Sequence, residues 1–190
     1  MKKVIGLLLF CLLFFSACNF SVDVEDNTGE DKEQSENNSE EKEDLHLQVT
    51  KVDEDAGVSV ENNEMYQMLD EFVQENPKFG VADDFSMQSV TLVTDTSDNQ
   101  KMLFLGVNRL GAPVKNVTFN LSLGNTDGDM VWEDFPVILD EEVAGVLENN
   151  AALPIFLPIT SQEQIELMNT ISQENLYIEF KDFKYETVEQ

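Results

Sequence analysis

The sequence predicts a mainly β fold, an antiparallel β-sandwich of about seven strands with two short connecting helices, preceded by a disordered acidic tether. Three observations lead to this prediction. Apolar and polar residues alternate in several short stretches after residue 44, as in strands with one buried and one wet face. Turn-forming Gly, Pro, Asn and Asp separate these stretches. Before residue 44 the chain is almost entirely acidic and polar beyond its leader. A small barrel is the alternative architecture.

Residues 1–17 are predicted to be a secretory signal peptide. Lys2 and Lys3 give a positive start, and an unbroken apolar run follows over residues 4–15. A helix needs ~20 apolar residues to cross the hydrocarbon core, so this run is too short for a permanent span. The charged start, short apolar run and small residues at the end are typical of a cleaved leader.

The sequence FSAC, which ends at Cys18, resembles the lipobox of bacterial lipoproteins. The resemblance implies cleavage between Ala17 and Cys18 and attachment of diacylglycerol to the Cys18 thiol. Phe15 departs from the leucine that the lipobox prefers. Cys11 follows a bulky phenylalanine and is a poor acceptor, and no cysteine follows Cys18. The alternative is an ordinary signal peptide in which Cys18 is incidental.

Residues 18–44 are predicted to be the lipidated cysteine and a disordered acidic linker. Acids, Asn, Ser and Gln dominate the segment, and such a composition buries too little apolar surface to offset the entropy of ordering. We expect it to hold the domain away from the membrane; an acidic tail that binds a partner is the alternative. The formal net charge of −27 repels phosphates, so we expect no nucleic-acid partner.

The domain is predicted to span residues 45–190 and to begin with a strand over 45–49, where apolar residues alternate with polar ones. Residues 53–63 are acidic and irregular. An amphipathic helix of about three turns follows, because its apolar residues recur at helical spacing, Asn63 can cap its start and Pro77 follows its end.

Strands are predicted over 85–94, 101–109, 117–123 and 130–139. In the second, Met102 and Phe104 lie on one face and Leu103, Leu105 and Val107 lie on the other. The third has the clearest alternation, and an Asp-Gly turn after it is typical of a hairpin. The fourth carries Trp132 and Phe135, and Trp132 is expected to fill the core.

Three elements complete the domain. Prolines in the apolar stretch 153–159 indicate an edge strand or a strand end. Ser161 and Gln164 can form a capping box that opens the second helix. Apolar residues alternate again over 176–185. Repeated short strands with turn signals favour a sandwich of immunoglobulin type, although the cysteine pair of antibody domains is missing.

Residues 85–135 resemble the SLAP-type domains of Gram-positive envelope proteins, which are Ig-like modules linked by name to S-layer assembly and accessory secretion. The shared pattern is a strand, a polar turn, a strand that ends near Asn108-Arg109, a pair such as Pro113-Val114, another strand, an Asp-Gly turn and a phenylalanine. The resemblance covers about 50 of the 190 residues. It implies a non-enzymatic envelope role, and no functional residue is carried over from it.

Few residues offer catalytic or metal-binding chemistry. His46 is the only histidine and Cys18 the only cysteine after the leader, so neither a Ser-His-Asp nor a Cys-His system is expected. One histidine also argues against zinc. Acids in the turn 125–129 have the spacing of a calcium loop, but Met130 replaces the required glycine and Pro136, at the twelfth position, replaces the required glutamate. We therefore predict no metal or cofactor.

The sequence predicts a non-enzymatic lipoprotein, anchored to the outer face of the cell membrane through Cys18, that acts as a binding or envelope-assembly module. Its expected partners are the membrane and an envelope protein or wall polymer. One alternative is a hydrolase that uses two of its many carboxylates on cell-wall or peptide substrates. Another is a substrate-capture lipoprotein, although the domain is short for a two-lobed binding protein.

Overall fold

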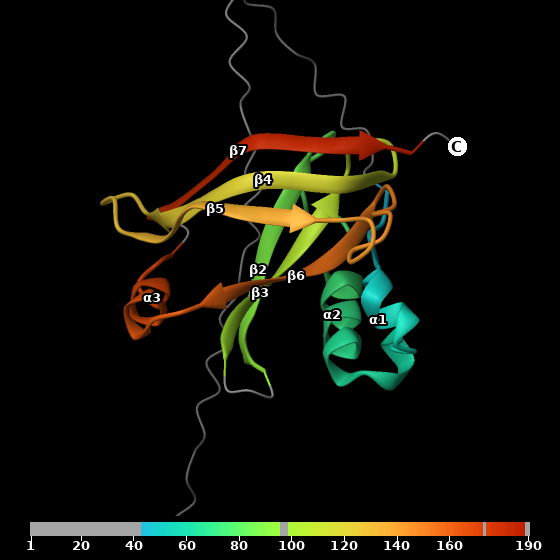
Figure 1. Cartoon of the computed structure of the whole chain (residues 1–190), viewed down its shortest axis with the longest axis horizontal. Coiled ribbons are helices and arrows are strands. Elements are labelled where there is room, and N and C mark those ends of the chain that lie inside the picture. The colour runs from blue at the N-terminus through green and yellow to red at the C-terminus, as the bar shows by residue number, and fades with distance from the viewer. Residues whose placement is uncertain (1–42, 96–98, 173, 189–190) are drawn as a thin grey trace, which may run out of the picture.

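Two β-sheets pack face to face, and helices lie on one outer face and at one end (Figure 1). The computed structural model describes residues 43–95, 99–172 and 174–188. In the described chain, one sheet has the order β1-β6-β3-β2 and the other the order β5-β4-β7, which confirms the predicted β-sandwich. The elements are β1 (His46–Leu47), α1 (Lys51–Asp55), the 3-10 helix η1 (Val60–Asn62), α2 (Glu64–Glu75), β2 (Phe85–Thr94), β3 (Gln100–Asn108), β4 (Val114–Asn125), β5 (Met130–Leu139), β6 (Ala151–Ile159), α3 (Gln162–Met168) and β7 (Leu176–Thr187).

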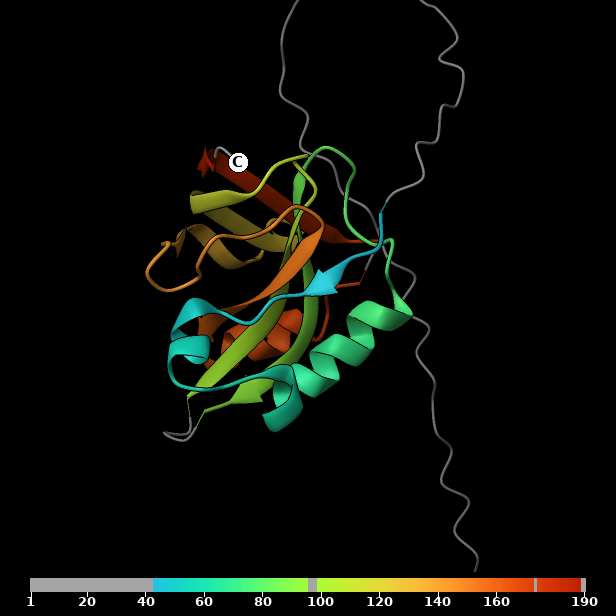
Figure 2. The same cartoon turned by 90° about the vertical axis from the view of Figure 1, so that its right-hand side faces the viewer.

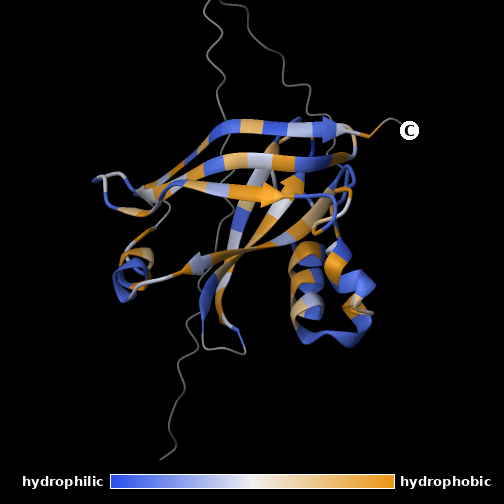
Figure 3. Cartoon of the chain, in the orientation of Figure 1, coloured by the Kyte–Doolittle hydropathy of each residue, from blue (hydrophilic) through white to orange (hydrophobic). Residues whose placement is uncertain are grey.

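The main core fills the space between the sheets with apolar side chains from alternate strand positions, an alternation that Figure 3 shows along the strands. Phe85 of β2 stacks on Phe183 of β7 with 5.4 Å between ring centroids. Phe119 of β4 meets Phe180 of β7 edge to face at 5.0 Å. Trp132 is buried in this core, as predicted, and its indole N–H donates to a backbone oxygen of β6 at 3.1 Å.

A smaller core lies on the outer face of the four-stranded sheet, beneath α2 (Figure 2). β3 contributes to both cores, because Met102 and Phe104 point into the sandwich while Leu103, Leu105 and Val107 point toward α2. This two-sided burial confirms the face assignment predicted for the strand. The predicted helix is α2, whose buried face covers the outer side of β3.

Three residues in the left-handed conformation bend the three-stranded sheet. Asn116, Asp134 and Asp182 have φ angles of 51°, 46° and 53°, and each lies where the strand register shifts. Asn and Asp tolerate this conformation better than other residues with a Cβ, and such bulges increase the local twist. The Asp134 N–H donates to the Ser122 hydroxyl at 3.1 Å, which replaces a lost ladder bond. The edges β5 and β7 are therefore bent.

The start of the domain differs from the prediction. β1 has two residues instead of the five predicted over 45–49, because Thr50 ends the extended stretch and accepts a hydrogen bond from the Asp53 N–H to cap α1. The stretch 53–63, predicted to be irregular, contains the end of α1 and the 3-10 helix η1. Neither helix is longer than five residues, and neither has an apolar periodicity that could have revealed it.

The prolines of β6 lie where the sequence placed them, beside an open edge. β1 pairs only with Ala151 and Ala152, so it stops before it reaches Pro154 and Pro158. From that point on, β6 pairs with β3 alone. A proline there costs no ladder bond if the N–H that it lacks would have pointed to the open side of the strand.

The sheets have the strand neighbours of an immunoglobulin constant-type sandwich, in which strands A, B, E and D form one sheet and C, F and G the other. If β1 is A, then β6, β3 and β2 take the places of B, E and D, and β7, β4 and β5 take those of C, F and G. The chain therefore visits these places in the order A-D-E-F-G-B-C. In addition, β1 runs parallel to β6. The β-sandwich is confirmed, but its connections are not those of an immunoglobulin domain, because the strands after β1 follow one another in a cyclically shifted order.

Candidate functional site at the N-terminal junction

The described chain begins at a junction where the N-terminal segment joins the domain. The Leu45 N–H donates to the Pro77 carbonyl at 2.8 Å, and the His46 N–H donates to the Asn150 carbonyl at 3.1 Å. The Leu45 side chain is buried in the smaller core. These contacts fix the segment between the α2–β2 connection and the start of β6.

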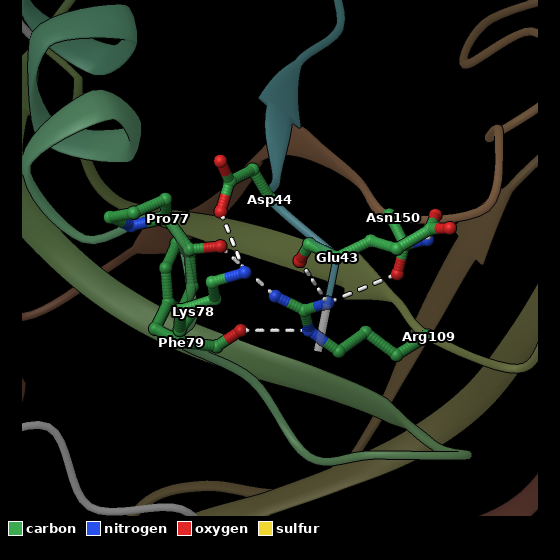
Figure 4. Close-up of polar contacts among 7 residues, drawn as sticks. All are labelled: Glu43, Asp44, Pro77, Lys78, Phe79, Arg109 and Asn150. Atoms are coloured by element: carbon green, nitrogen blue, oxygen red, sulfur yellow. Dashed lines mark hydrogen bonds and ion pairs between the residues drawn. The ribbon is translucent and has the colours of Figure 1, made fainter. Parts of the chain in front are cut away.

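Arg109 binds this junction from below, as Figure 4 shows. Its Nη1 donates to the Glu43 carbonyl and to the Asn150 side-chain oxygen, both at 3.0 Å. Its Nε donates to the Phe79 carbonyl at 3.0 Å, and its Nη2 donates to the Pro77 carbonyl at 3.1 Å. We call Arg109 and these four acceptors the Arg109 clamp. The clamp joins three segments that are far apart in the sequence.

The position of Arg109 in the fold explains how it reaches these acceptors. It follows β3 directly, and its backbone N–H donates to the Asp84 carbonyl at 3.0 Å, which continues the β2–β3 ladder by one pair. The side chain is 5% exposed. Guanidinium is planar and carries five donors in a fixed fork, so it can bind several carbonyl oxygens at once, whereas lysine offers a single nitrogen.

The charge on Arg109 is buried, and nearby acids partly compensate for that burial. Desolvation lowers the pKa of Arg109, while the charges of Asp44 and Glu43 raise it. Arginine stays protonated in proteins, so the site holds a permanent cation. The Glu43 carboxylate also accepts a hydrogen bond from the Asn150 amide at 2.7 Å, and Lys78 pairs with Asp44 at 2.8 Å. These outer contacts are exposed and therefore weak, so Arg109, the backbone bonds of Leu45 and His46, and the buried Leu45 side chain hold the segment.

Asn108, next to Arg109, fixes the other side of the same corner. It is fully buried, and its amide nitrogen donates to the carbonyls of Ala112, Leu147 and Glu148 at 2.9–3.1 Å. Its side-chain oxygen accepts from the Leu110 N–H at 3.0 Å. The sequence reasoning treated this pair only as a strand end. The available signal was an amide and a basic residue directly after an apolar strand.

The predicted site residues fall into two groups. Ala17 and Cys18, the predicted cleavage and lipidation site, lie outside the described residues together with the rest of the leader and the tether up to residue 42. His46 lies on β1 and is exposed. In the turn after β4, the Asn125 side-chain oxygen accepts from the N–H groups of Asp127 and Asp129 at 3.0 and 2.9 Å. Asn125 thus stabilises the turn itself.

The described residues hold no group of three or more His, Cys, Asp or Glu side chains that could bind a metal ion. None of the helices in the same ranges is long and apolar enough to cross a membrane. One open hollow lies beside α3 and is lined partly by Asp129, Glu133 and Glu163. A backbone N–H and the Ser161 hydroxyl bond to Glu163 and lower its pKa. A general acid needs the opposite shift.

No protein-family model, no curated protein and no solved structure matches this chain. The likeness to lipoproteins and to SLAP-type domains therefore remains a prediction. The Arg109 clamp joins a buried guanidinium to four acceptors from three segments, and it lies at the N-terminal end of the described domain.

Proposed function

We propose that this protein is an extracytoplasmic lipoprotein, anchored to the cell membrane through Cys18, whose sandwich acts as a non-catalytic binding or envelope-assembly module. The lipobox-like sequence carries the proposal, because it combines a short apolar leader with a cysteine at the predicted cleavage point. A diacylated cysteine supplies the two chains that stable anchoring requires.

The Arg109 clamp supports this proposal. A domain held by one end works best if the chain leaves it at a fixed point, since the orientation of its surfaces toward the membrane then depends on that point. Arg109 fixes the backbone at Glu43, the first described residue, which lies at the end of the predicted tether. The clamp binds mainly backbone oxygens, so it holds the segment whatever side chains precede it.

Labelling with a fatty acid tests the anchor. Cells that express the full chain receive radioactive palmitate, and the protein is then isolated and counted. We expect Cys18→Ala to abolish the label and to move the protein from the membrane to the soluble fraction. Cys11→Ala is the matched control, because Cys11 lies in the predicted leader and its loss should leave the label unchanged. Label that persists in Cys18→Ala would refute the proposed anchor.

Sedimentation with envelope fractions tests the binding role. The Cys18→Ala chain is mixed with isolated cell-wall sacculi or with washed membranes and then centrifuged. We expect the folded chain to sediment with one of these fractions and the urea-unfolded chain to remain in solution. Absence of the folded chain from both pellets would argue against an envelope-binding module.

A further inference from the structure

We propose that two copies of this chain pair through β2, whose open edge joins the same edge of a second copy in an antiparallel arrangement. β2 ends the four-stranded sheet, so β3 pairs with one side of it and no described strand pairs with the other. The proposal goes beyond the function above because it names one surface and its partner. It does not depend on the lipid anchor.

β2 is the least protected edge of the described sandwich. Its sequence, FSMQSVTLVT, contains no charged residue, no proline and no glycine, and a single register shift at Val90 interrupts its pairing with β3. Proteins usually block open edges with charges, prolines or bulges. β5 carries Glu133, Asp134 and Pro136, β7 carries five charged residues, and the open part of β6 carries two prolines. β2 is thus the described edge best suited to accept another strand.

The uncharged sequence of β2 lets a second copy supply that strand at this edge without facing charges. In a two-fold antiparallel pair, each strand meets its own sequence, and like charges that face each other across strands are destabilising. The chain carries a net charge of −27, so most of its surface opposes self-association. β2 presents ten uncharged residues, several of them β-branched, and its pairing with itself creates no facing charges.

The hydrogen bonds between β2 and β3 show which backbone groups of β2 point away from β3. At one end, the Arg109 N–H donates to the Asp84 carbonyl, and at the other, the Asp95 N–H donates to the Asn99 carbonyl. Hydrogen-bonded and non-hydrogen-bonded pairs alternate in an antiparallel ladder. On each side of the register shift, these two bonds therefore determine which residues of β2 bond to β3 and which point to the open edge. The residues whose backbone groups point to the open edge are Phe85, Met87, Ser89, Leu92 and Thr94. Among these groups, the Phe85 N–H donates to the Asp84 side chain, and the carbonyls of Ser89 and Leu92 each accept one bond from a side chain of β2 itself.

These outward-pointing groups face each other in a symmetric pair. A two-fold axis between Val90 and Thr91 places the backbone groups of Met87 opposite those of Thr94 and the groups of Ser89 opposite those of Leu92. The carbonyls of Ser89 and Leu92 can each accept a second hydrogen bond there. Side chains on the same face of the sheet then also meet across the axis. The facing pairs are Met87 with Thr94, Gln88 with Val93, and Ser89 with Leu92.

Disulfide cross-linking of the full chain tests this arrangement. Gln88→Cys together with Val93→Cys places two thiols in a facing pair with Cα atoms about 4.5 Å apart, within disulfide range. Within one chain the same positions are about 16 Å apart along the strand and cannot bond. After mild oxidation, we expect a dimer on a non-reducing gel. Glu179→Cys with Lys184→Cys on β7 is the matched control, because it has the same spacing across a register shift.

Leu92 provides the second arm of the test, in the Gln88→Cys and Val93→Cys background. Leu92→Pro removes an N–H that points to the open edge, so we expect the dimer to fall to the level of the β7 pair. Leu92→Ala keeps that N–H, and the dimer should persist. Urea unfolding verifies that each variant is folded. No dimer from the β2 pair, equal dimer from both pairs, or a dimer that survives Leu92→Pro in a folded chain would overturn the proposal.

Discussion

Arg109 shows how one side chain can determine where a chain enters its domain. Its guanidinium is buried among backbone oxygens of two segments that precede it and the side-chain oxygen of Asn150, which follows it by 41 residues. The energy of such a site depends less on the bonds that form than on the cost of leaving their acceptors unpaired. Substitutions at Arg109 should therefore affect stability more strongly than substitutions of exposed bases.

We expect Arg109→Met to lower the free energy of unfolding by about 3 kcal/mol, because buried carbonyl oxygens lose their donors. Arg109→Lys keeps the charge but not the fork, and about 1–2 kcal/mol should be lost. Urea unfolding measures both values. Lys184→Met on β7 is the control and should change stability by no more than about 0.5 kcal/mol, since Lys184 is exposed. An Arg109→Met chain as stable as the parent would contradict this account.

Tyr66 links α2 to α1 and gives the fold an alkaline limit. Its hydroxyl donates to the Asp53 carboxylate at 2.5 Å and accepts from the Thr50 N–H at 3.2 Å. Burial and the bond to Asp53 raise the pKa of Tyr66 to about 12. A raised pKa in the folded state stabilises the fold fully below the unfolded value near 10, and the contribution is lost as pH rises toward 12.

Tyr66→Phe should therefore cost about 1–2 kcal/mol at neutral pH. It should also flatten the fall in stability between pH 10 and 12, because the variant has no hydroxyl to ionise there. Urea unfolding at several pH values measures both effects. Tyr185→Phe removes an exposed hydroxyl and is the matched control. Equal alkaline slopes for the parent and Tyr66→Phe would show that Tyr66 does not set this limit.

Among the elements, α2 depends on the residue that precedes it, Asn63. The Asn63 side chain accepts from the N–H groups of Met65 and Tyr66 at 3.0 and 3.2 Å and so caps the helix. We expect Asn63→Ala to cost about 1 kcal/mol, whereas Asn63→Asp retains the cap and should cost little. Thermal unfolding of both variants checks this. Equal losses in the two variants would mean that the cap is unimportant.

The elements that could be predicted are those whose pattern repeats over several turns or strand pairs. The bounds of β2 and β5 agree with the prediction to the residue, because turn-forming residues follow both stretches directly. α1 could not be predicted, since its five residues contain only one apolar side chain, Val52. The Arg109 clamp could not be predicted either, because its acceptors are backbone oxygens that any sequence provides.

For the whole molecule, the sandwich could be predicted but not its strand order. Alternation tells which side of a strand is buried, and it says nothing about which strands become neighbours. The pairing of β6 with β3 and of β7 with β4 joins residues 40 or more positions apart. The cyclic shift relative to an immunoglobulin domain is therefore a property of long-range contacts that leaves no local signal.

The excess of acidic residues should make stability depend on salt. With a net charge of −27, like charges repel one another across the folded surface. Added salt shortens the screening length from about 30 Å at 0.01 M to about 3 Å at 1 M, so we expect the melting temperature to rise with NaCl. Calorimetry at several concentrations measures the rise. A fall would mean that attractive ion pairs outweigh the repulsion.

The position of the clamp also decides how the molecule yields when it is pulled. Force that arrives from the N-terminal side loads the bonds of Arg109 to Glu43 first and then the short β1–β6 pair. Once these break, residues 45–84 can be drawn out, which adds up to about 140 Å of length. The main core, built from β2 to β7, stays closed meanwhile. The domain would thus extend in a separate first step before its sandwich opens, with Arg109 setting the force at which that step begins.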